Sequence, residues 1–291
     1  MPDTYIKNAN TWSKFKKAFI KNDGTWSEIK TIWIKDSGVW QKVFVNETIV
    51  DVSSQNNINL KTLYTNQTGS SPSSAVRVIY NINGNIGSTS RATASLVTDT
   101  WPAGSEIFIN IGSGVSVLGA GGNSGFDNID PGGGAQSGGD AISLSFNVTI
   151  SNLGTIGGGG GAGGSLIASG AGSCPSGSIF ALGGGGAGSV AGSKSIHGRV
   201  TCSSANTSGA ANGTTTTGGN GSSQTVGGGA YTFTYIGGKG GDLGQAGAQG
   251  SDSSSIYATR YFPGGAAGKA IALNTYTATR PVVGTVIGSV S

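Results

Sequence analysis

The sequence predicts an all-β protein in which three stretches of different composition follow one another. Apolar residues alternate with polar ones at several places, the pattern of a strand with one buried face. The first residues form an internal repeat, and most of the 55 glycines follow residue 118. We therefore expect a β-meander at residues 1–46, a domain of short strands at 47–118 and a glycine-rich domain at 119–291.

Residues 1–46 repeat with a period of 14. Aromatic residues recur in register at two positions of the repeat, first at Tyr5, Phe19 and Trp33 and then at Trp12, Trp26 and Trp40. Gly24 and Gly38 stand where a hairpin loop needs a left-handed residue. The period predicts strands of about eleven residues joined by three-residue turns.

Three strands of this kind rarely form a stable unit alone. We therefore expect residues 1–46 to dock on a partner or to associate with further copies of the chain. The tryptophans of the repeat, Trp12, Trp26 and Trp40, are the candidate attachment residues.

The same residues carry the charge of the protein. Eight lysines against four acidic residues account for the formal net charge of +4, and charged residues make up only 10% of the chain. No arginine cluster with interleaved aromatic residues follows, so we expect a solvated lysine face and no nucleic-acid partner.

Residues 47–118 have an ordinary composition and read as short strands. Alternating apolar residues are Ile58 and Leu60, then Val76, Val78, Tyr80 and Ile82, then Ile107, Ile109 and Ile111. No helical periodicity is evident in this stretch.

The glycine-rich half also contains strand patterns. Five apolar residues alternate from Ile142 to Ile150, and Tyr231, Phe233 and Tyr235 alternate in the same way. Collagen is excluded because the glycines have no three-residue period, and a flexible linker does not carry such alternation. The remaining interpretation is a bundle of polyglycine-II-type helices mixed with β segments, whose backbone groups must bond laterally.

The residues that metal sites and catalysis require are sparse. The single histidine, His197, excludes a metal site built on two histidines, and Lys239 and Lys269 lack the Ser or Thr that follows the lysine of a phosphate-binding loop. We expect no enzyme, no metal and no cofactor. Cys174 and Cys202 lack metal-site spacing, and a disulfide or two free thiols stay open as alternatives.

No apolar run is long enough to span a membrane, and the first residues do not form a secretory signal. We therefore expect a chain that is made in a cytoplasm and works outside a cell only after lysis or within a particle.

Several segments after residue 100 resemble those of a known family. They are Trp101–Ser105, Ile107–Asn110, Val117–Gly122, Gly139–Leu144, Asn152–Ile156 and Pro263–Ile271. These segments are similar to the glycine-rich region of bacteriophage tail-fibre and host-specificity proteins. The resemblance implies a virion protein of the tail tip, bound to other tail or baseplate proteins, whose polyglycine-type helices bear receptor-binding loops. Fibres of this kind are commonly trimers.

Within the glycine-rich half, aromatic segments are the candidates for contact with a bacterial receptor, either a surface sugar or an outer-membrane protein. The candidate residues are Tyr231, Phe233, Tyr235, Tyr257, Arg260, Tyr261 and Phe262, and the segment 174–202 is a further candidate. Burial of these aromatic residues is the alternative interpretation. The alternative function is a structural tail component that does not bind the host.

Overall fold

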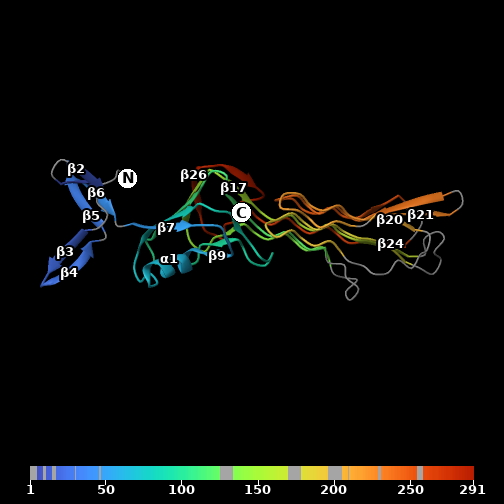
Figure 1. Ribbon diagram of the computed structural model, residues 1–291, viewed down its shortest axis with the longest axis horizontal. Coiled ribbons are helices and arrows are strands. Elements are labelled where there is room, and N and C mark those ends of the chain that lie inside the picture. The colour runs from blue at the N-terminus through green and yellow to red at the C-terminus, as the bar shows by residue number, and fades with distance from the viewer. Residues whose placement is uncertain are drawn as a thin grey trace.

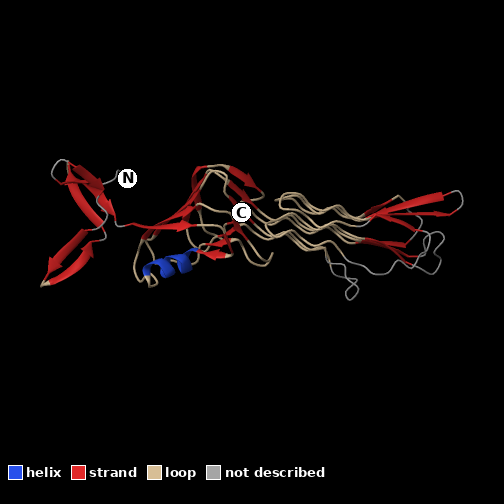
Figure 2. Cartoon of the chain, in the orientation of Figure 1, coloured by secondary structure: helices blue, strands red, loops and turns tan. Residues whose placement is uncertain are grey.

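The computed structural model describes residues 5–8, 11–14, 18–29, 31–45, 47–124, 134–169, 178–195, 205–208, 210–228, 231–253 and 258–291. The molecule is elongated (Figure 1). Hairpins lie at one end, a body of parallel strands lies in the middle, and glycine-rich segments extend from it to a second set of strands at the other end (Figure 2). The described residues form many strands and one helix, so the chain expected to be all-β is mostly β.

Each 14-residue repeat folds as a separate two-stranded hairpin. The pairs are β1 (Tyr5–Asn8) with β2 (Thr11–Lys14), β3 (Ala18–Asn22) with β4 (Thr25–Ile29), and β5 (Thr31–Asp36) with β6 (Val39–Val45). The predicted meander is therefore wrong. Strands of four to seven residues replace the long ones, and within the described residues of this segment neighbouring repeats do not share a sheet.

The turns of the second and third hairpins explain this difference. Asp23 and Gly24 alone form the second turn, with φ angles of 47° and 80°, and Ser37 and Gly38 form the third, with 48° and 86°. Two consecutive positive φ angles define a type I′ turn, whose twist matches that of the strands it joins. In the second and third repeats a two-residue turn reverses the chain inside the repeat, so each of these repeats closes on itself.

Three parallel sheets form the middle of the molecule, and successive strands enter them in turn. The first sheet holds β7 (Glu47–Val52), β10 (Arg77–Ile82), β13 (Glu106–Ile111), β16 (Val148–Asn152) and β26 (Ala278–Val282). The second holds β8 (Gln55–Asn56), β11 (Ile86–Gly87), β14 (Ser116–Leu118), β17 (Thr155–Gly157) and β27 (Thr285–Ile287). The third holds β9 (Ile58–Asn59), β12 (Leu96–Val97), β15 (Ile142–Ser143) and β25 (Ile271–Ala272). This order, repeated coil after coil, is that of a parallel β-helix.

The inward side chains of the coils form the main core. Val78, Tyr80 and Ile82 are fully buried, and Tyr80 stands opposite Ile109 of the next coil. Burial of a large apolar side chain contributes about 1.5–3 kcal/mol. The Tyr80 hydroxyl donates a hydrogen bond of 2.6 Å to the carbonyl oxygen of Leu60, which satisfies it inside the core. The alternating strands predicted around Val78–Ile82 and Ile107–Ile111 are present as β10 and β13, whereas Leu60 of the third predicted stretch begins a helix.

The alternating stretch from Ile142 to Ile150 is not one strand. β15 ends at Ser143 and β16 begins at Val148, so the chain turns a corner of the β-helix between them. Ile142, Val148 and Ile150 are all buried, and Phe146 packs partly buried against the same core. The alternation identified the inward residues correctly, but it continues through the corner and conceals it.

One helix, α1 (Leu60–Thr68), contradicts the expectation of strands alone in residues 47–118. The side-chain oxygen of Asn59 accepts a hydrogen bond of 3.0 Å from an amide of the first turn, and Gly69 ends the helix with a φ of 79°. Leu60, Leu63 and Tyr64 pack on the β-helix core. Their i, i+3, i+4 spacing after a capping Asn is the helix signal that the strand interpretation missed. No helix in the described residues is long and apolar enough to cross a membrane.

The glycine-rich segments leave the β-helix at one corner, between the second and third sheets. The connection at this corner is Asn57 alone in the first coil, and it lengthens to residues 88–95, 119–141 and 158–270 in the coils that follow. Strands from both sides of residue 119 share all three sheets. The expected division at 118/119 therefore marks a change of composition rather than a boundary between sheets.

Outside the named strands, the glycine-rich segments are joined by lateral backbone hydrogen bonds. The amide of Gly163 donates to Gly184 at 2.8 Å, and the amide of Gly184 donates to Gly238 at 3.0 Å. The segments lie too close together for side chains at many positions. A Cβ atom on Gly161 would lie 1.9 Å from the carbonyl oxygen of Gly265. Glycine is required at such positions because backbones of neighbouring segments approach each other directly.

Candidate receptor-binding tip and attachment surface

Two antiparallel sheets form the end of the glycine-rich segments (Figure 1). One sheet contains β18 (Leu166–Ser169), β19 (Ser178–Ala181) and β24 (Ala258–Tyr261), and the other contains β20 (Ala205–Ser208), β21 (Ser223–Gly228), β22 (Tyr231–Ile236) and β23 (Ser251–Asp252). They share a small core of Leu166, Ala168, Ile179, Ala181, Val226 and Tyr235. We call this unit the tip; its core is separate from that of the β-helix.

Some of the predicted receptor-binding residues lie inside the tip. Tyr235 is completely buried, and Phe233, two residues earlier on the same face of β22, packs partly buried against the same core. Phe262 is only 6% exposed. Buried side chains are not available to a receptor, so neither Tyr235, which belongs to the core of the tip, nor Phe262 is placed to contact one.

Arg260 and Tyr261, in contrast, are exposed on β24, an edge strand of its sheet. The guanidinium carbon of Arg260 lies 4.9 Å from the ring centroid of Phe262, a cation–π contact. Tyr261 is 41% exposed. The pair thus offers an anchored guanidinium, which recognises carboxylates, phosphates and carbonyl oxygens, beside an exposed aromatic ring.

Asp252 of β23 links this edge strand to the second sheet. The Thr259 hydroxyl donates a hydrogen bond of 2.9 Å to the Asp252 carboxylate. Desolvation, followed by the hydrogen bond and negative charge of Asp252, raises the pKa of Tyr261. Tyr261 therefore remains a neutral hydrogen-bonding group well above neutral pH.

The remaining predicted residues of this region fall outside the description. Tyr257, Cys174 and Cys202, with the disulfide alternative, lie outside the described residues. Tyr231 opens β22, and its side chain is not among the described ones.

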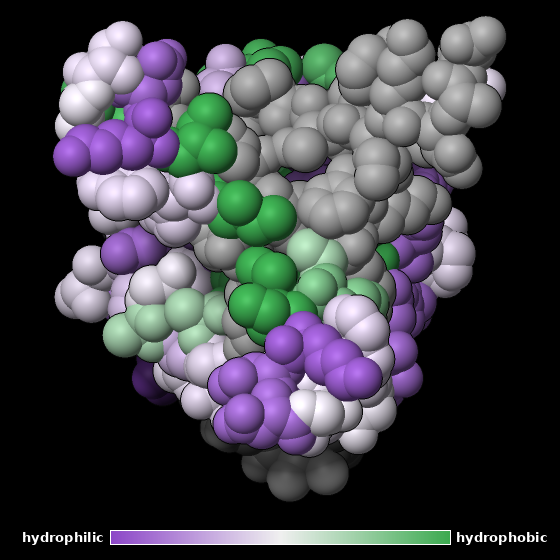
Figure 3. Space-filling view, turned by 90° about the vertical axis from the view of Figure 1, so that its left-hand side faces the viewer, coloured by the Kyte–Doolittle hydropathy of each residue, from purple (hydrophilic) through white to green (hydrophobic). Residues whose placement is uncertain are grey.

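The hairpins at the opposite end of the molecule expose large apolar side chains. Trp26 and Trp40, at equivalent positions of the second and third repeats, are 65% and 63% exposed, while the side chain of Trp12 is not among the described ones. Further exposed residues, which the sequence interpretation did not assign to attachment, are Phe19, Ile20, Trp33, Ile34 and Val39. Figure 3 shows hydrophobic patches between hydrophilic residues at this end. We call these described residues the attachment surface.

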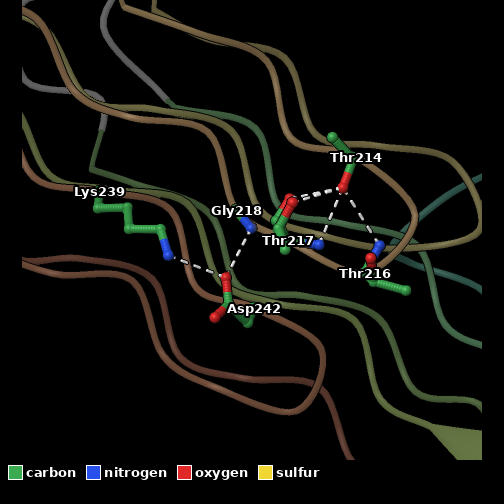
Figure 4. Close-up of polar contacts among 6 residues, drawn as sticks. All are labelled: Thr214, Thr216, Thr217, Gly218, Lys239 and Asp242. Atoms are coloured by element: carbon green, nitrogen blue, oxygen red, sulfur yellow. Dashed lines mark hydrogen bonds and ion pairs between the residues drawn. The ribbon is translucent and has the colours of Figure 1, made fainter.

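A polar turn lies where the glycine-rich segments meet the β-helix (Figure 4). The Asp242 carboxylate accepts hydrogen bonds from the Gly218 amide at 2.9 Å and from the Lys239 ammonium at 3.1 Å. The Gly218 bond first, and then Lys239, lower the pKa of Asp242. In the facing turn the Thr214 hydroxyl oxygen accepts a hydrogen bond of 2.9 Å from the Thr217 amide.

Beside this turn, Leu243 packs against Leu118, Ala187 and Ile287 in a small apolar cluster. Ile287 belongs to β27 and Leu118 to β14, so the cluster fixes the glycine-rich segments to the second sheet of the β-helix.

The chain thus exposes large apolar side chains on its hairpins and carries a separately packed tip at the opposite end (Figure 1). The model of one protein family, described as phage tail fibre adhesin Gp38, matches residues 46–291. The chain belongs to this family of phage tail fibre adhesins. The match confirms the resemblance found in the sequence and the predicted function of a tail-fibre protein that binds the host receptor, and it places the chain in the tail of the virion.

Among solved structures, the chain is similar to the crystal structure of the gp37-gp38 adhesin tip complex of the bacteriophage S16 long tail fibre. The two chains are 22% identical, the similarity covers 85% of this chain and 83% of that chain, and the TM-score is 0.48. No curated protein matches the chain. The family match begins at residue 46, so the hairpins lie outside it.

Proposed function

We propose that the tip is the part of this adhesin that contacts the receptor, a sugar or an outer-membrane protein of the bacterial surface, and that Arg260 and Tyr261 are contact residues. The observation that carries this proposal is their exposure on a tip with its own core, at the end of the molecule remote from the hairpins (Figure 1). A guanidinium and an aromatic ring are the groups that most often supply binding energy at interfaces.

We further propose that the glycine-rich segments are polyglycine-type helices that act as a rigid scaffold for the loops of the tip. Such helices make no internal hydrogen bonds, so lateral bonds such as that from Gly163 to Gly184 must satisfy their backbone. A bundle bonded on several sides holds the tip at a fixed distance from the β-helix.

The attachment surface is proposed to bind another tail protein. Large apolar side chains in solvent favour burial against a partner, and two-stranded hairpins gain stability from such packing. Because the chain carries three equivalent hairpins, a fibre end with three equivalent subunits is the partner that would use each of them. A homotrimer of this chain is the second way to cover the same surface.

No enzymatic activity, cofactor or nucleic-acid partner is part of the proposal. In the residues that the structure describes, no group of three or more His, Cys, Asp or Glu side chains is placed to hold a metal ion. The chain is made in the host cytoplasm and leaves the cell within the virion.

The receptor proposal is tested with purified, fluorescently labelled protein and a panel of bacterial strains. We expect binding to some strains, and loss of that binding in the variant carrying both Arg260→Ala and Tyr261→Ala. Arg280→Ala, which removes an exposed arginine of the β-helix, is the matched control and is expected to bind like the original. Equal binding by the double variant on every strain would remove these two residues from the contact.

The attachment proposal is tested in phage particles that carry Trp26→Ala and Trp40→Ala together. We expect the adhesin to be missing from purified particles, measured by mass spectrometry, although the isolated protein remains folded. Light scattering of the isolated chain distinguishes binding to another tail protein from homotrimer formation, because a homotrimer has three times the mass of the monomer.

A further inference from the structure

The outward face of the first β-helix sheet carries a groove far from the tip. The groove has a volume of about 330 Å³ and lies over β13, β16 and β26. The residues that give it its chemistry are Glu106, Phe108, Asn147, Thr149, Thr277 and Thr279. This volume is at the lower end of the range of about 300–1,000 Å³ for sites that bind small molecules.

The register of the sheet explains why the face is hollow here. Phe108 of β13 stands beside Thr149 of β16, and Thr149 stands beside Thr279 of β26. The bulky ring of Phe108 is thus followed, across the sheet, by the short side chains of Thr149 and Thr279. The floor is a stretch of threonine and asparagine bordered by the ring.

Phe108 is held in place from its other side. The guanidinium carbon of Arg77, on the neighbouring strand β10, lies 4.3 Å from the ring centroid. Arg77 is itself fixed by Glu47 at 3.4 Å and by Glu106 at 2.5 Å. Since β10 and β16 flank β13 on opposite sides, the stack leaves the groove side of the ring for a ligand.

Apart from the Glu106 carboxylate, which is paired with Arg77, the polar groups of the groove are neutral donors and acceptors. The side-chain oxygen of Asn147 accepts a hydrogen bond of 2.8 Å from the Thr277 amide, which leaves its NH₂ group to donate. Thr149 and Thr279 add hydroxyls that both donate and accept. Such a set suits a ligand that is rich in hydroxyl groups.

Other ligand classes fit less well. No lysine or arginine lines the groove, and the nearby Arg77 is already paired with two carboxylates, so an anionic ligand finds no cation there. A peptide that adds a strand would bind at the open edge of β26 and not over the floor of the groove, because β13 and β16 are paired on both sides.

We propose that this groove is a saccharide-binding site on the side of the β-helix. It takes a neutral sugar of the bacterial surface, with a C–H face of the sugar ring against Phe108 and the hydroxyls bonded to Asn147, Thr149 and Thr279. The site is additional to the tip and does not depend on it. A weak lateral contact of this kind raises the avidity of a fibre whose tip is also engaged.

The test is saturation-transfer NMR on the full chain, with the methyl glycosides of glucose, galactose and N-acetylglucosamine as probes. We expect saturation transfer to at least one glycoside. Thr149→Trp fills the floor and Phe108→Ala removes the ring, and each is expected to weaken binding by about tenfold or more. Ile49→Trp, which places the same side chain in the same row of the sheet but on β7, is the matched control and is expected to bind normally.

Three outcomes would overturn the assignment. They are no transfer from any glycoside to the folded chain, transfer that persists in both folded groove variants, and transfer that disappears in the Arg260→Ala tip variant. The last outcome would place the sugar at the tip. If the groove variants lose saturation transfer but still bind to cells normally, the groove and the tip are two separate binding sites.

Discussion

Replacement of Gly161 by alanine tests whether direct approach of backbones holds the glycine-rich segments together. Gly161 lies in the interior of these segments, where the added methyl group would stand 1.9 Å from the carbonyl oxygen of Gly265. Real Cβ contacts almost never fall below 3.0 Å. The two segments must therefore separate by about 1 Å to admit the methyl group.

The magnitude follows from the hydrogen bonds that this movement disturbs. The two segments are joined by the Gly265 amide, which donates to the Ala162 carbonyl oxygen at 2.8 Å, and by the Gly268 amide, which donates to the Gly159 carbonyl oxygen at 2.8 Å. A buried polar group left without its partner costs about 1–3 kcal/mol. We expect the substitution to lower the free energy of unfolding of the glycine-rich part by about 3 kcal/mol, which corresponds to a fall of about 6–12 °C in its unfolding midpoint.

Gly134→Ala is the matched control, because a methyl group there would meet nothing within 4 Å. Alanine at such a position leaves stability unchanged or raises it by about 0.4–1 kcal/mol through the unfolded chain. Both variants are measured by thermal and urea unfolding. Equal midpoints for Gly161→Ala and Gly134→Ala would refute the argument from close approach.

Three further predictions concern the β-helix, the polar turn that contains Asp242, and the tip. Tyr80→Phe removes a buried hydrogen bond of 2.6 Å and is expected to cost about 1–1.5 kcal/mol in urea unfolding; an unchanged midpoint would contradict a stabilising role for the bond. The Gly218 amide lowers the pKa of Asp242 in the folded chain, so the carboxylate stabilises the fold above its ordinary pKa, and this stability is lost as the pH falls through the lowered value. Because the Asp242 side chain is half exposed, Asp242→Asn is expected to lower the free energy of unfolding by less than about 1 kcal/mol at neutral pH and to leave it unchanged in acid. Urea unfolding at a series of pH values measures this difference. Tyr235→Ala opens a cavity in the tip core and is expected to lower the free energy of unfolding by about 3–5 kcal/mol. Tyr261→Ala is expected to lower it by less than about 0.5 kcal/mol and to reduce binding to cells. Similar midpoints for the two variants would contradict their placement inside and outside the tip.

Period-2 alternation in the sequence predicted which residues face inward, but not how the strands are arranged. The pattern from Ile142 to Ile150 continues through a corner between two sheets, because the inward positions on both sides of the corner keep the same phase. The coiling itself depends on pairing between strands that lie far apart in the sequence, such as β16 with β26. No local pattern specifies such pairing.

The candidate site was predicted as a region rather than as a set of contacts. The aromatic alternation of β22 marked one face of a strand, but either face could have pointed outward. In the folded chain that face supplies the core, because the surrounding glycine-rich segments offer little other apolar material to bury Tyr235. Exposure of Trp26 and Trp40 was easier to anticipate, since a two-stranded hairpin has no second layer to cover its side chains.

Because the long segments leave the β-helix at a single corner, the residues that stabilise the coil are separate from those that form the tip. An insertion at a corner leaves and re-enters the coil at adjacent positions, so it does not alter the inward residues that stabilise the coil. The entropy cost of closing a loop grows only slowly with its length. Lateral hydrogen bonds between the segments offset part of the entropy cost of ordering their backbones. The step from Asn57 in the first coil to residues 158–270 in the fourth is therefore compatible with one unchanged core. Changes at the tip should accordingly alter what the adhesin binds without disturbing the part that carries it.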